Sequence, residues 1–413
     1  MKAVVFTLGC KVNECESDSL IEGLIERGYE VYDKLVPADI YIVNTCAVTK
    51  EAEKKSRQTA SRIKKLNPQA KIIYTGCACQ KNPQSFADKS GEYLVTGTFS
   101  KGEILNLLDK TGVCVAPENK EFEELLPVKS LRTRTYVKVQ DGCNNFCSYC
   151  IIPYLRGRSR SRAPESVINE ITLTNPKEAV INGINLSAYN HNGTKLTGLI
   201  SALKSVDCRI RLGSLEANVI TEEFLTALKG LKNFARHFHL SLQSGSDSVL
   251  KKMNRKYTAS AFIEKVELIR KFFPEAGITT DIIAGFPTET EEEFNQTLAL
   301  IDRVKFSDIH AFCFSPREGT VAYKMQDLPI EIKRQRLNVL LQKKQECKSA
   351  FIKSQIGKVL DFLPEENKGE YTLGYTDNYL RVYVKNFNRA KEFTKIKIVS
   401  EFEEGAIAIP FED

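Results

Sequence analysis

The chain has 413 residues, 42% of them hydrophobic and 27% charged, and its net charge of +7 comes from 59 basic and 52 acidic residues. This length and composition are ordinary for a soluble protein of two or three domains, and the mild positive charge permits a nucleic-acid partner without requiring one. The N-terminal apolar run is too short for a signal peptide, and no run approaches the roughly 18 apolar residues that span a membrane, so we expect a cytoplasmic protein with no membrane partner.

Residues 1–112 alternate apolar runs typical of strands with runs typical of helices. We expect strands at 2–8, 38–45 and 71–76, and helices at 14–28 and 49–68. Continuous apolar strands separated by helices predict a doubly wound parallel sheet. Cys10, Cys46 and Cys77 each come just after one of these strands. In such a sheet the ends of the strands share one edge, where ligands bind, so the three cysteines could share a metal site.

The cysteines are not expected to form disulfides in a reducing compartment, so a cysteine cluster is first interpreted as a metal site or a nucleophile. The stretch TGCACQ (75–80) contains two thiols, Cys77 and Cys79. Cys77 stands at the strand end, level with Cys10 and Cys46, and directly follows a glycine that opens a turn. We therefore expect Cys77 to be the third ligand, and whether Cys79 can replace it stays open at this point.

A linker is predicted at 113–134, where an acidic patch, prolines and basic residues interrupt the alternation. Beyond it, strand and helix alternate six times up to residue 345. The expected strands are 135–140, 178–184, 209–214, 236–242, 278–284 and 308–314. Six units predict a partial (β/α) barrel, and barrels carry their active sites on the loops that follow the strands. A basic helix is expected at 331–357, and five short strands from 358 onward predict a small closed sheet or barrel.

The segment DGCNNFCSYC (141–150) places Cys143, Cys147 and Cys150 in a C-x-x-x-C-x-x-C spacing after the first barrel strand. Three thiolates within eight residues can wrap one compact ion or cluster, and thiolates suit soft metals and iron–sulfur clusters. A zinc site is the alternative, but it needs a fourth ligand, and the next Cys or His downstream is His191. Three ligands on a four-iron cluster would leave one iron open, as a catalytic metal site requires.

This spacing, with Tyr149 before the last cysteine, is the signature of the radical S-adenosylmethionine (SAM) superfamily. Motifs over nearly the whole chain, in the same order, resemble the tRNA methylthiotransferases. They are TLGCKVN (7–13), VNTCAVT (43–49), TGC (75–77), DGCNNFCSYCIIPYLRGRSRSR (141–162), LSLQSGSDSVLKKMNRKYT (240–258), TDIIAGFPTETEEEF (280–294) and FSPREGT (314–320). The LGCKVN opening resembles the subclass that acts on threonylcarbamoyladenosine, and sister subclasses act on isopentenyladenosine or on a ribosomal protein. The end of the chain is similar to the RNA-binding TRAM domain.

The resemblance implies three domains and two clusters. The domains would be a methylthiotransferase N-terminal domain (1–125), a radical SAM barrel (135–345) and a TRAM-like domain (354–413). Cys143, Cys147 and Cys150 would hold the catalytic [4Fe–4S] cluster that generates a radical from SAM, and that radical would take hydrogen from C2 of the adenosine 3′ of the anticodon. Cys10, Cys46 and Cys77 would hold a second [4Fe–4S] cluster carrying the sulfur, which a second SAM methylates. The expected partners are the tRNA anticodon loop, an electron donor and a sulfur donor, and a monomer suffices.

Several polar residues are candidates for SAM or RNA contacts, each with a structural alternative. Residues on loops after barrel strands could contact SAM or merely cap turns: Asn185, Ser214, Glu216 and Gln243. Asp281, inside the fifth strand, could face the lumen or be structural. Arg317 in SPREGT could assist SAM or tRNA binding, or form a salt bridge at the barrel rim.

Four alternating arginines follow the cysteine motif in YLRGRSRSR: Arg156, Arg158, Arg160 and Arg162. Because nucleic-acid affinity comes mainly from the phosphate backbone, we expect these arginines to contact tRNA phosphates; an ordinary basic loop is the alternative. For the protein as a whole, the alternatives are the same chemistry on isopentenyladenosine, or a non-catalytic RNA-binding protein with structural metal sites.

Overall fold

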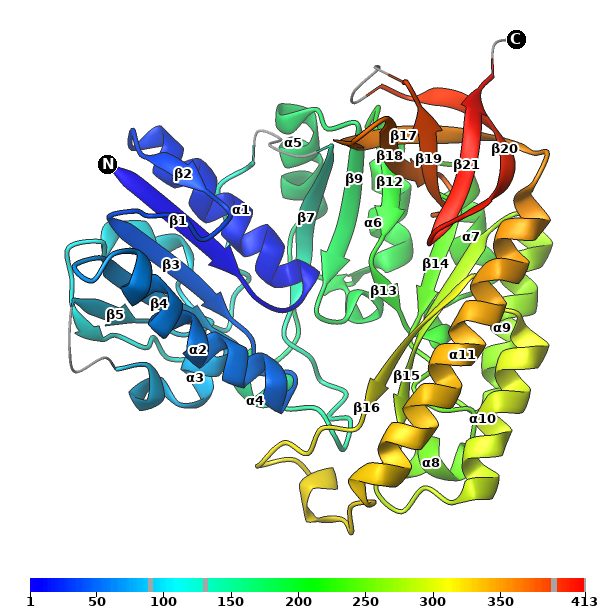
Figure 1. Ribbon diagram of the computed structural model, residues 1–413, viewed down its shortest axis with the longest axis horizontal. Coiled ribbons are helices and arrows are strands. Elements are labelled where there is room, and N and C mark those ends of the chain that lie inside the picture. Colours follow the sequence, from blue (N-terminus) through cyan, green and yellow to red (C-terminus); the bar gives the residue numbers. More distant parts are fainter. Residues whose placement is uncertain (88–91, 129–132, 388–391, 412–413) are drawn as a thin grey trace.

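The computed structural model describes residues 1–87, 92–128, 133–387 and 392–411, in which three units follow one another along the chain (Figure 1). The N-terminal unit is a parallel sheet with strand order β2–β1–β3–β4–β5–β6. Its strands are β1 (Lys2–Thr7), β2 (Glu30–Tyr32), β3 (Ile40–Thr45), β4 (Lys71–Gly76), β5 (Tyr93–Val95) and β6 (Gly112–Val113). Its α-helices are α1 (Lys11–Glu26), α2 (Lys50–Leu66) and α3 (Cys77–Lys81).

Both faces of this sheet are buried, which explains why its strands are apolar throughout. Val4 of β1 packs in one core with Ile63 of α2, whereas the next residue, Val5, packs in a second core with Leu24 of α1. Successive side chains of a strand point to opposite faces, so the two helices cover opposite sides of the sheet. The doubly wound parallel sheet expected from the sequence is therefore confirmed.

The central unit is a curved set of parallel strands that forms the expected partial barrel. Two sheets, β12–β9–β7–β8 and β13–β14–β15–β16, meet where Ile210 of β12 bridges in parallel to Phe234, just before β14. The long strands are β7 (Arg134–Asp141), β9 (Glu178–Gly183), β12 (Arg209–Leu212), β14 (His237–Leu240), β15 (Gly277–Ala284) and β16 (Asp308–Cys313). Among the short strands, β13 (Ser214–Leu215) is parallel to β14, whereas β8 (Arg160–Ser161) runs antiparallel to β7. The strands β10 (Asn190–His191) and β11 (Thr194–Lys195) form a separate antiparallel pair.

Helices cover the outside of these strands (Figure 1). They are α5 (Pro164–Thr174), α6 (Leu196–Ala202), α7 (Glu222–Lys229), α8 (Asp247–Lys252), α9 (Ala259–Phe272), α10 (Glu291–Val304) and α11 (Ile330–Gln355). The short helix α4 (Ile152–Leu155) packs instead against the N-terminal sheet. The start of α10 is fixed by a capping box, in which Thr290 and Glu293 satisfy each other's backbone N–H groups. The largest apolar core lies between the strands and these helices.

The C-terminal unit is a closed antiparallel and parallel barrel with strand order β17–β18–β19–β21–β20. Its strands are β17 (Val359–Lys368), β18 (Tyr371–Thr376), β19 (Arg381–Lys385), β20 (Thr394–Phe402) and β21 (Gly405–Pro410). It packs on the N-terminal ends of the central strands: Arg134 pairs with Glu365, and His237 stacks on Tyr379 with ring centroids 4.4 Å apart. The C-terminal barrel thus lies at the opposite end of β7 from Cys143.

The structure shows that the first residue of the predicted linker (113–134) still belongs to the N-terminal sheet. The sheet extends to β6 at residue 113, and residues 129–132 of the predicted linker lie outside the described residues. None of the helices in the described part of the chain combines the length and apolar character needed to cross a membrane.

Candidate active site

The Cys143 loop, residues 142–150, begins directly after β7 with a tight turn. Gly142 has φ +69°, and a Cβ at this position would collide with the carbonyl oxygen of Arg158, so only glycine fits. The loop then folds back on itself, because the Cys150 N–H donates to the Cys147 carbonyl at 2.9 Å. Cys143, Cys147 and Cys150 therefore share one short loop at the C-terminal end of the first barrel strand.

N–H donors lie close to the sulfur atoms of this loop, including the Ile152 backbone N–H beside Cys150. The Asn145 backbone N–H lies 3.5 Å from Cys143 Sγ, and Asn185 Nδ2 lies 3.8 Å from the same sulfur. Arg255 Nη1 lies 3.3 Å from Cys147 Sγ. Donors of this kind stabilise negative sulfur, as in thiolate ligands of iron–sulfur clusters. The donor set therefore fits a [4Fe–4S] cluster.

Arg255 is a site residue that the sequence analysis missed. Besides Cys147, it pairs with Glu216 at 3.1 Å, and Glu216 in turn accepts from Asn145 Nδ2 at 2.6 Å. This places the predicted candidate Glu216 next to the Cys143 loop, where it orients two groups that contact the sulfurs. In the sequence, Arg255 follows the polar segment KKMN (251–254). Such a segment by itself indicates a solvated loop.

Cys10, Cys46 and Cys77 come together at the edge of the N-terminal sheet, beyond the ends of β1, β3 and β4. Gly9 has φ +111°, and a Cβ there would come within 2.9 Å of Cys46 Sγ, so the turn before Cys10 needs glycine to pass this thiol. Burial, together with the neighbouring Cys77 and Cys10, raises the pKa of Cys46 to about 12. The three thiols are thus close enough to influence one another, and their donor set fits a second cluster.

The Cys79 side chain points away from the side of α3 that carries the Cys77 thiol. It lies two residues after Cys77 in α3, and two residues turn an α-helix by about 200°, so the two side chains leave opposite sides of the helix. Cys79 Sγ lies 3.4 Å from the Thr45 hydroxyl and is fully buried. Burial raises its pKa to about 12, and its charged neighbours are Lys101 and Cys77 rather than Cys10 or Cys46.

A buried ionic network lies between the two cysteine sets. Glu16 of α1 binds Arg156 at 2.7 Å, Lys138 at 2.9 Å and Lys101 at 3.2 Å. Asp141, at the end of β7, binds Lys138 at 2.7 Å and Arg156 at 3.1 Å. Burial by itself would raise the pKa of Glu16, but Arg156 and the two lysines outweigh it and hold that pKa well below its usual range. This network joins the N-terminal sheet to the barrel.

Arg156 also links the network to both cysteine loops of the sheet. Its Nη2 donates to Asn13 Oδ1 at 2.7 Å, and Asn13 lies three residues after Cys10. Burial raises the pKa of Cys77, and the Arg156 charge beside it opposes that effect. Arg156 is therefore a structural cation of the interface that favours negative charge at Cys77.

The positions of the four alternating arginines correct the prediction that all of them contact tRNA phosphates. Arg156 is 0% and Arg162 only 6% exposed, and Arg162 is held by Glu170 and Glu124. Arg160 donates to the carbonyls of Arg156 and Arg158 and lies 3.5 Å from Asp141. Arg158 is exposed, with its guanidinium over the Phe146 ring at 4.6 Å. An alternating pattern could not predict that acidic partners from distant segments would bury three of the four.

A cavity of about 240 Å³ touches both cysteine-bearing loops. Val48 and Thr49, which follow Cys46, form part of its wall, and Tyr149 of the Cys143 loop forms another part. The rest of the lining is Gln243, Asp281, Ile283, Phe312, Cys313, Phe314 and Ser315. Tyr149 is held by an edge-on contact with Phe286, whose centroid is 6.4 Å away. The cavity therefore adjoins the segment that follows Cys46 and the loop that carries Cys143, Cys147 and Cys150.

The other predicted SAM contacts fall into two groups. Asn185 lies beside the Cys143 loop, and Gln243 lines the cavity, whereas Ser214 is exposed in β13 opposite His239. Arg317 is not a ligand contact, because it is buried in an ion pair with Glu53 of α2; the salt-bridge alternative is the correct one.

Asp281 faces the lumen, but its carboxylate is already engaged. Its two oxygens accept from His239 at 3.1 Å and from His310 at 3.3 Å. These bonds show the structural role that was the alternative for Asp281, and its contact with SAM stays a prediction.

Two family models match the chain. The radical SAM superfamily model covers residues 137–301, and a model described as uncharacterized protein family UPF0004 covers residues 2–97. A threonylcarbamoyladenosine tRNA methylthiotransferase of Bacillus subtilis, MtaB, is 36% identical over 100% of this chain and 98% of its own length. This chain belongs to the radical SAM tRNA methylthiotransferases.

Other relatives also match this methylthiotransferase over most of its length. The MtaB enzyme of Thermotoga maritima is 39% identical over 99% of this chain and 97% of its own. The tRNA-2-methylthio-N(6)-dimethylallyladenosine synthase of Desulfitobacterium hafniense is 34% identical over 92% and 90%. The family expected from the sequence motifs is therefore confirmed, and the chain is a radical SAM enzyme.

Solved structures share the fold of this methylthiotransferase. The radical SAM methyltransferase TsrM from Kitasatospora setae, determined with cobalamin and a [4Fe–4S] cluster, has a TM-score of 0.52 at 14% identity, covering 76% of this chain and 74% of its own. The cobalamin-dependent radical SAM enzyme OxsB has a TM-score of 0.51 at 14% identity, over 84% of this chain and 56% of its own. Both likenesses concern the fold.

Proposed function

We propose that this enzyme attaches a methylthio group to C2 of threonylcarbamoyladenosine beside the tRNA anticodon. One observation carries the proposal: a single cavity is lined by the residues that follow Cys46 and by Tyr149 within the Cys143 loop. A base seated there lies within reach of two cysteine sets, one on each unit. Radical activation and sulfur insertion at the same carbon need such an arrangement. The full-length similarity to relatives named for this activity supports the choice of substrate.

The residues of the Cys143 loop have distinct roles in this proposal. Cys143, Cys147 and Cys150 hold a [4Fe–4S] cluster, which when bound supplies the electron that cleaves SAM to a radical. Arg255 and Asn185 donate to the ligand sulfurs and fix their orientation. The cofactor supplies the difficult chemistry, and the protein supplies position and exclusion of water.

Cys10, Cys46 and Cys77 hold a second cluster in the proposal, as the source of the inserted sulfur. The sheet edge that carries these three cysteines is joined to the Cys143 loop by the buried network of Glu16 and Arg156. A rigid connection of this kind keeps the spacing of the two sites fixed, and catalytic geometry must be held to fractions of an ångström.

We further propose how the enzyme meets its partners. The exposed Arg158 beside the Cys143 loop contacts phosphate, and a base splayed from a single-stranded loop enters the cavity. The C-terminal barrel acts as a TRAM-like RNA-binding domain. The enzyme works as a cytoplasmic monomer with an external electron donor and an external sulfur donor.

Anaerobic reconstitution tests the enzyme assignment. The purified chain, loaded with iron and sulfide and reduced in the presence of SAM, is expected to bind about eight iron atoms, as two four-iron clusters do, and to form 5′-deoxyadenosine. Iron analysis and chromatography provide the readouts. A chain that holds one tightly bound zinc and cleaves no SAM would be a structural metalloprotein, and the proposal would fail.

A further inference from the structure

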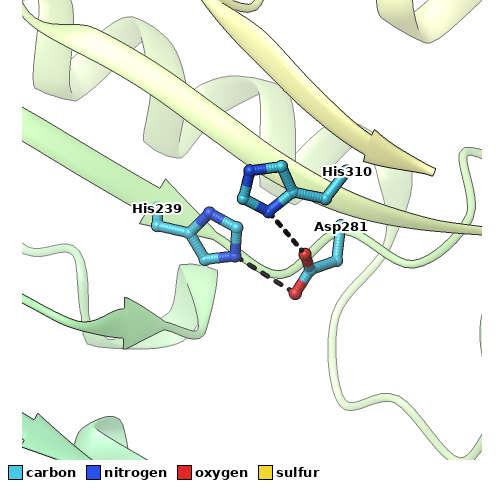
Figure 2. Close-up of side chains that lie close together, drawn as sticks. All are labelled: His239, Asp281 and His310. Atoms are coloured by element: carbon cyan, nitrogen blue, oxygen red, sulfur yellow. Dashed lines mark hydrogen bonds and ion pairs between the residues drawn. The ribbon is translucent and has the colours of Figure 1, made fainter. Parts of the chain in front are cut away.

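Two histidines and an aspartate form a hydrogen-bonded cluster inside the barrel (Figure 2). They come from three neighbouring strands: His239 from β14, Asp281 from β15 and His310 from β16. One ring nitrogen of each histidine and one carboxylate oxygen of Asp281, the atoms that could bind a metal ion, all lie within 4.8 Å of one another. The two imidazole rings are stacked at 5.3 Å with Asp281 between their nitrogens, as Figure 2 shows.

Strand register places this cluster next to the cavity. Asp281 pairs directly with His310, and Ile283 pairs with Phe312. Residues two apart on a strand share a face, so His310 lies on the same face as Phe312, which lines the cavity together with Asp281. His310 is the member of the cluster with an open side, since 45% of its side chain is exposed, against 9% for His239.

The hydrogen bonds orient His310 for binding a ligand. Burial by itself would raise the pKa of Asp281, but the bonds from His239 and His310 outweigh it and lower that pKa, so Asp281 remains a carboxylate. His239 is fixed from its other side by the Thr279 hydroxyl at 2.9 Å. His310 uses Nδ1 toward Asp281, and among the described residues none lies within hydrogen-bond distance of its Nε2. That nitrogen remains for a ligand.

We propose that His310, oriented by Asp281, binds the carboxylate of the threonylcarbamoyl group and thereby selects this nucleoside over one with a hydrocarbon substituent. The inference rests on the proposed function, because it concerns the same cavity. A protonated imidazole between two carboxylates makes a charge-assisted hydrogen bond to each. An isopentenyl group offers no partner to His310 Nε2 and would leave that nitrogen desolvated and unpaired, a cost that rejects such a substrate.

The cavity wall has an apolar part and a polar part. Tyr149, Ile283, Phe312 and Phe314 present apolar surface to a planar base. The polar part of the wall is formed by Thr49, Gln243, Asp281 and Ser315, and His310 lies beside Asp281 on the neighbouring strand. A base with a charged substituent matches both parts, and a base with an apolar substituent matches only the first.

Binding of matched RNAs to the reconstituted enzyme tests the inference. Three stem-loops of one sequence carry threonylcarbamoyladenosine, isopentenyladenosine or unmodified adenosine, and fluorescence anisotropy gives the dissociation constants. For the wild type we expect the tightest binding to the first RNA. His310→Leu is expected to weaken that binding about tenfold or more, as loss of a charge-assisted hydrogen bond does, and to leave the unmodified RNA unaffected. Single-turnover product formation should follow the same order.

His191→Leu provides the matched control, because His191 lies on β10 outside the barrel lumen and binds a backbone carbonyl. It should keep the wild-type preference. If the wild type itself does not prefer the threonylcarbamoyl RNA, the proposed function fails. If the wild type prefers it and His310→Leu, folded by circular dichroism and with full iron content, prefers it equally, the inference about His310 fails. A divalent metal bound by the wild type and lost in His310→Leu would also overturn it.

Discussion

Cys77→Ala is expected to lower the iron content of the reconstituted enzyme from about eight to about four atoms per chain, whereas Cys79→Ala is expected to leave it unchanged. The reason is geometric. Cys77 lies beside Cys46 and Cys10, while Cys79 leaves the other side of α3 and contacts the Thr45 hydroxyl at 3.4 Å. Loss of one of three thiolates leaves a cluster with two protein ligands, which the site cannot retain. Iron analysis and electron paramagnetic resonance of the reduced protein measure the difference.

The two substitutions control for each other, since both remove a buried sulfur from the same short helix. A general loss of folding would therefore lower the iron content of both variants. If iron falls only in Cys79→Ala, the ligand has been assigned to the wrong thiol. If neither variant loses iron, the N-terminal cysteines do not hold a cluster.

Arg156→Met is expected to lower the free energy of unfolding by about 3 kcal/mol, the cost typical of removing one partner from a buried ion pair. Arg156 is 0% exposed and binds both Glu16 and Asp141, so methionine leaves Glu16 with Lys101 and Lys138, and Asp141 with Lys138 and the more distant Arg160. Urea unfolding followed by circular dichroism measures the change. Arg158→Met is the matched control, because Arg158 is exposed, and it should cost less than about 1 kcal/mol.

The same pair of variants separates structural from RNA-binding roles. Arg158→Met should weaken tRNA binding and lower its salt dependence, since one phosphate contact is lost. Equal stability losses in both variants would contradict the buried network. A loss of tRNA affinity confined to Arg156→Met, at wild-type stability, would restore the original prediction for that residue.

The strands and the cysteine sets could be predicted from the sequence because each depends on local pattern. Continuous apolar runs marked the parallel strands, and the helix expected at 49–68 is found as α2, Lys50–Leu66. The edge of a parallel sheet collects whatever follows its strands, which is why Cys10, Cys46 and Cys77 could be associated across more than sixty residues of sequence.

The charge partners could not be predicted in the same way. Arg156 meets Glu16 across 140 positions, and Arg317 meets Glu53 across 264. An arginine pattern shows where charge lies along the chain, but burial depends on which distant segment packs against it. The His239, Asp281 and His310 cluster likewise depends on the register of three strands, which the sequence alone does not determine.

Mass spectrometry of tRNA nucleosides tests the central claim most directly. Nucleosides are compared between cells that contain this protein, cells that lack it, and cells that lack it but carry the gene for the Cys143→Ala variant. The account predicts that the 2-methylthio derivative of threonylcarbamoyladenosine disappears without the protein, that its unmethylthiolated precursor accumulates, and that the variant does not restore it. Loss of only the 2-methylthio derivative of isopentenyladenosine, with the threonylcarbamoyl derivative intact, would contradict it.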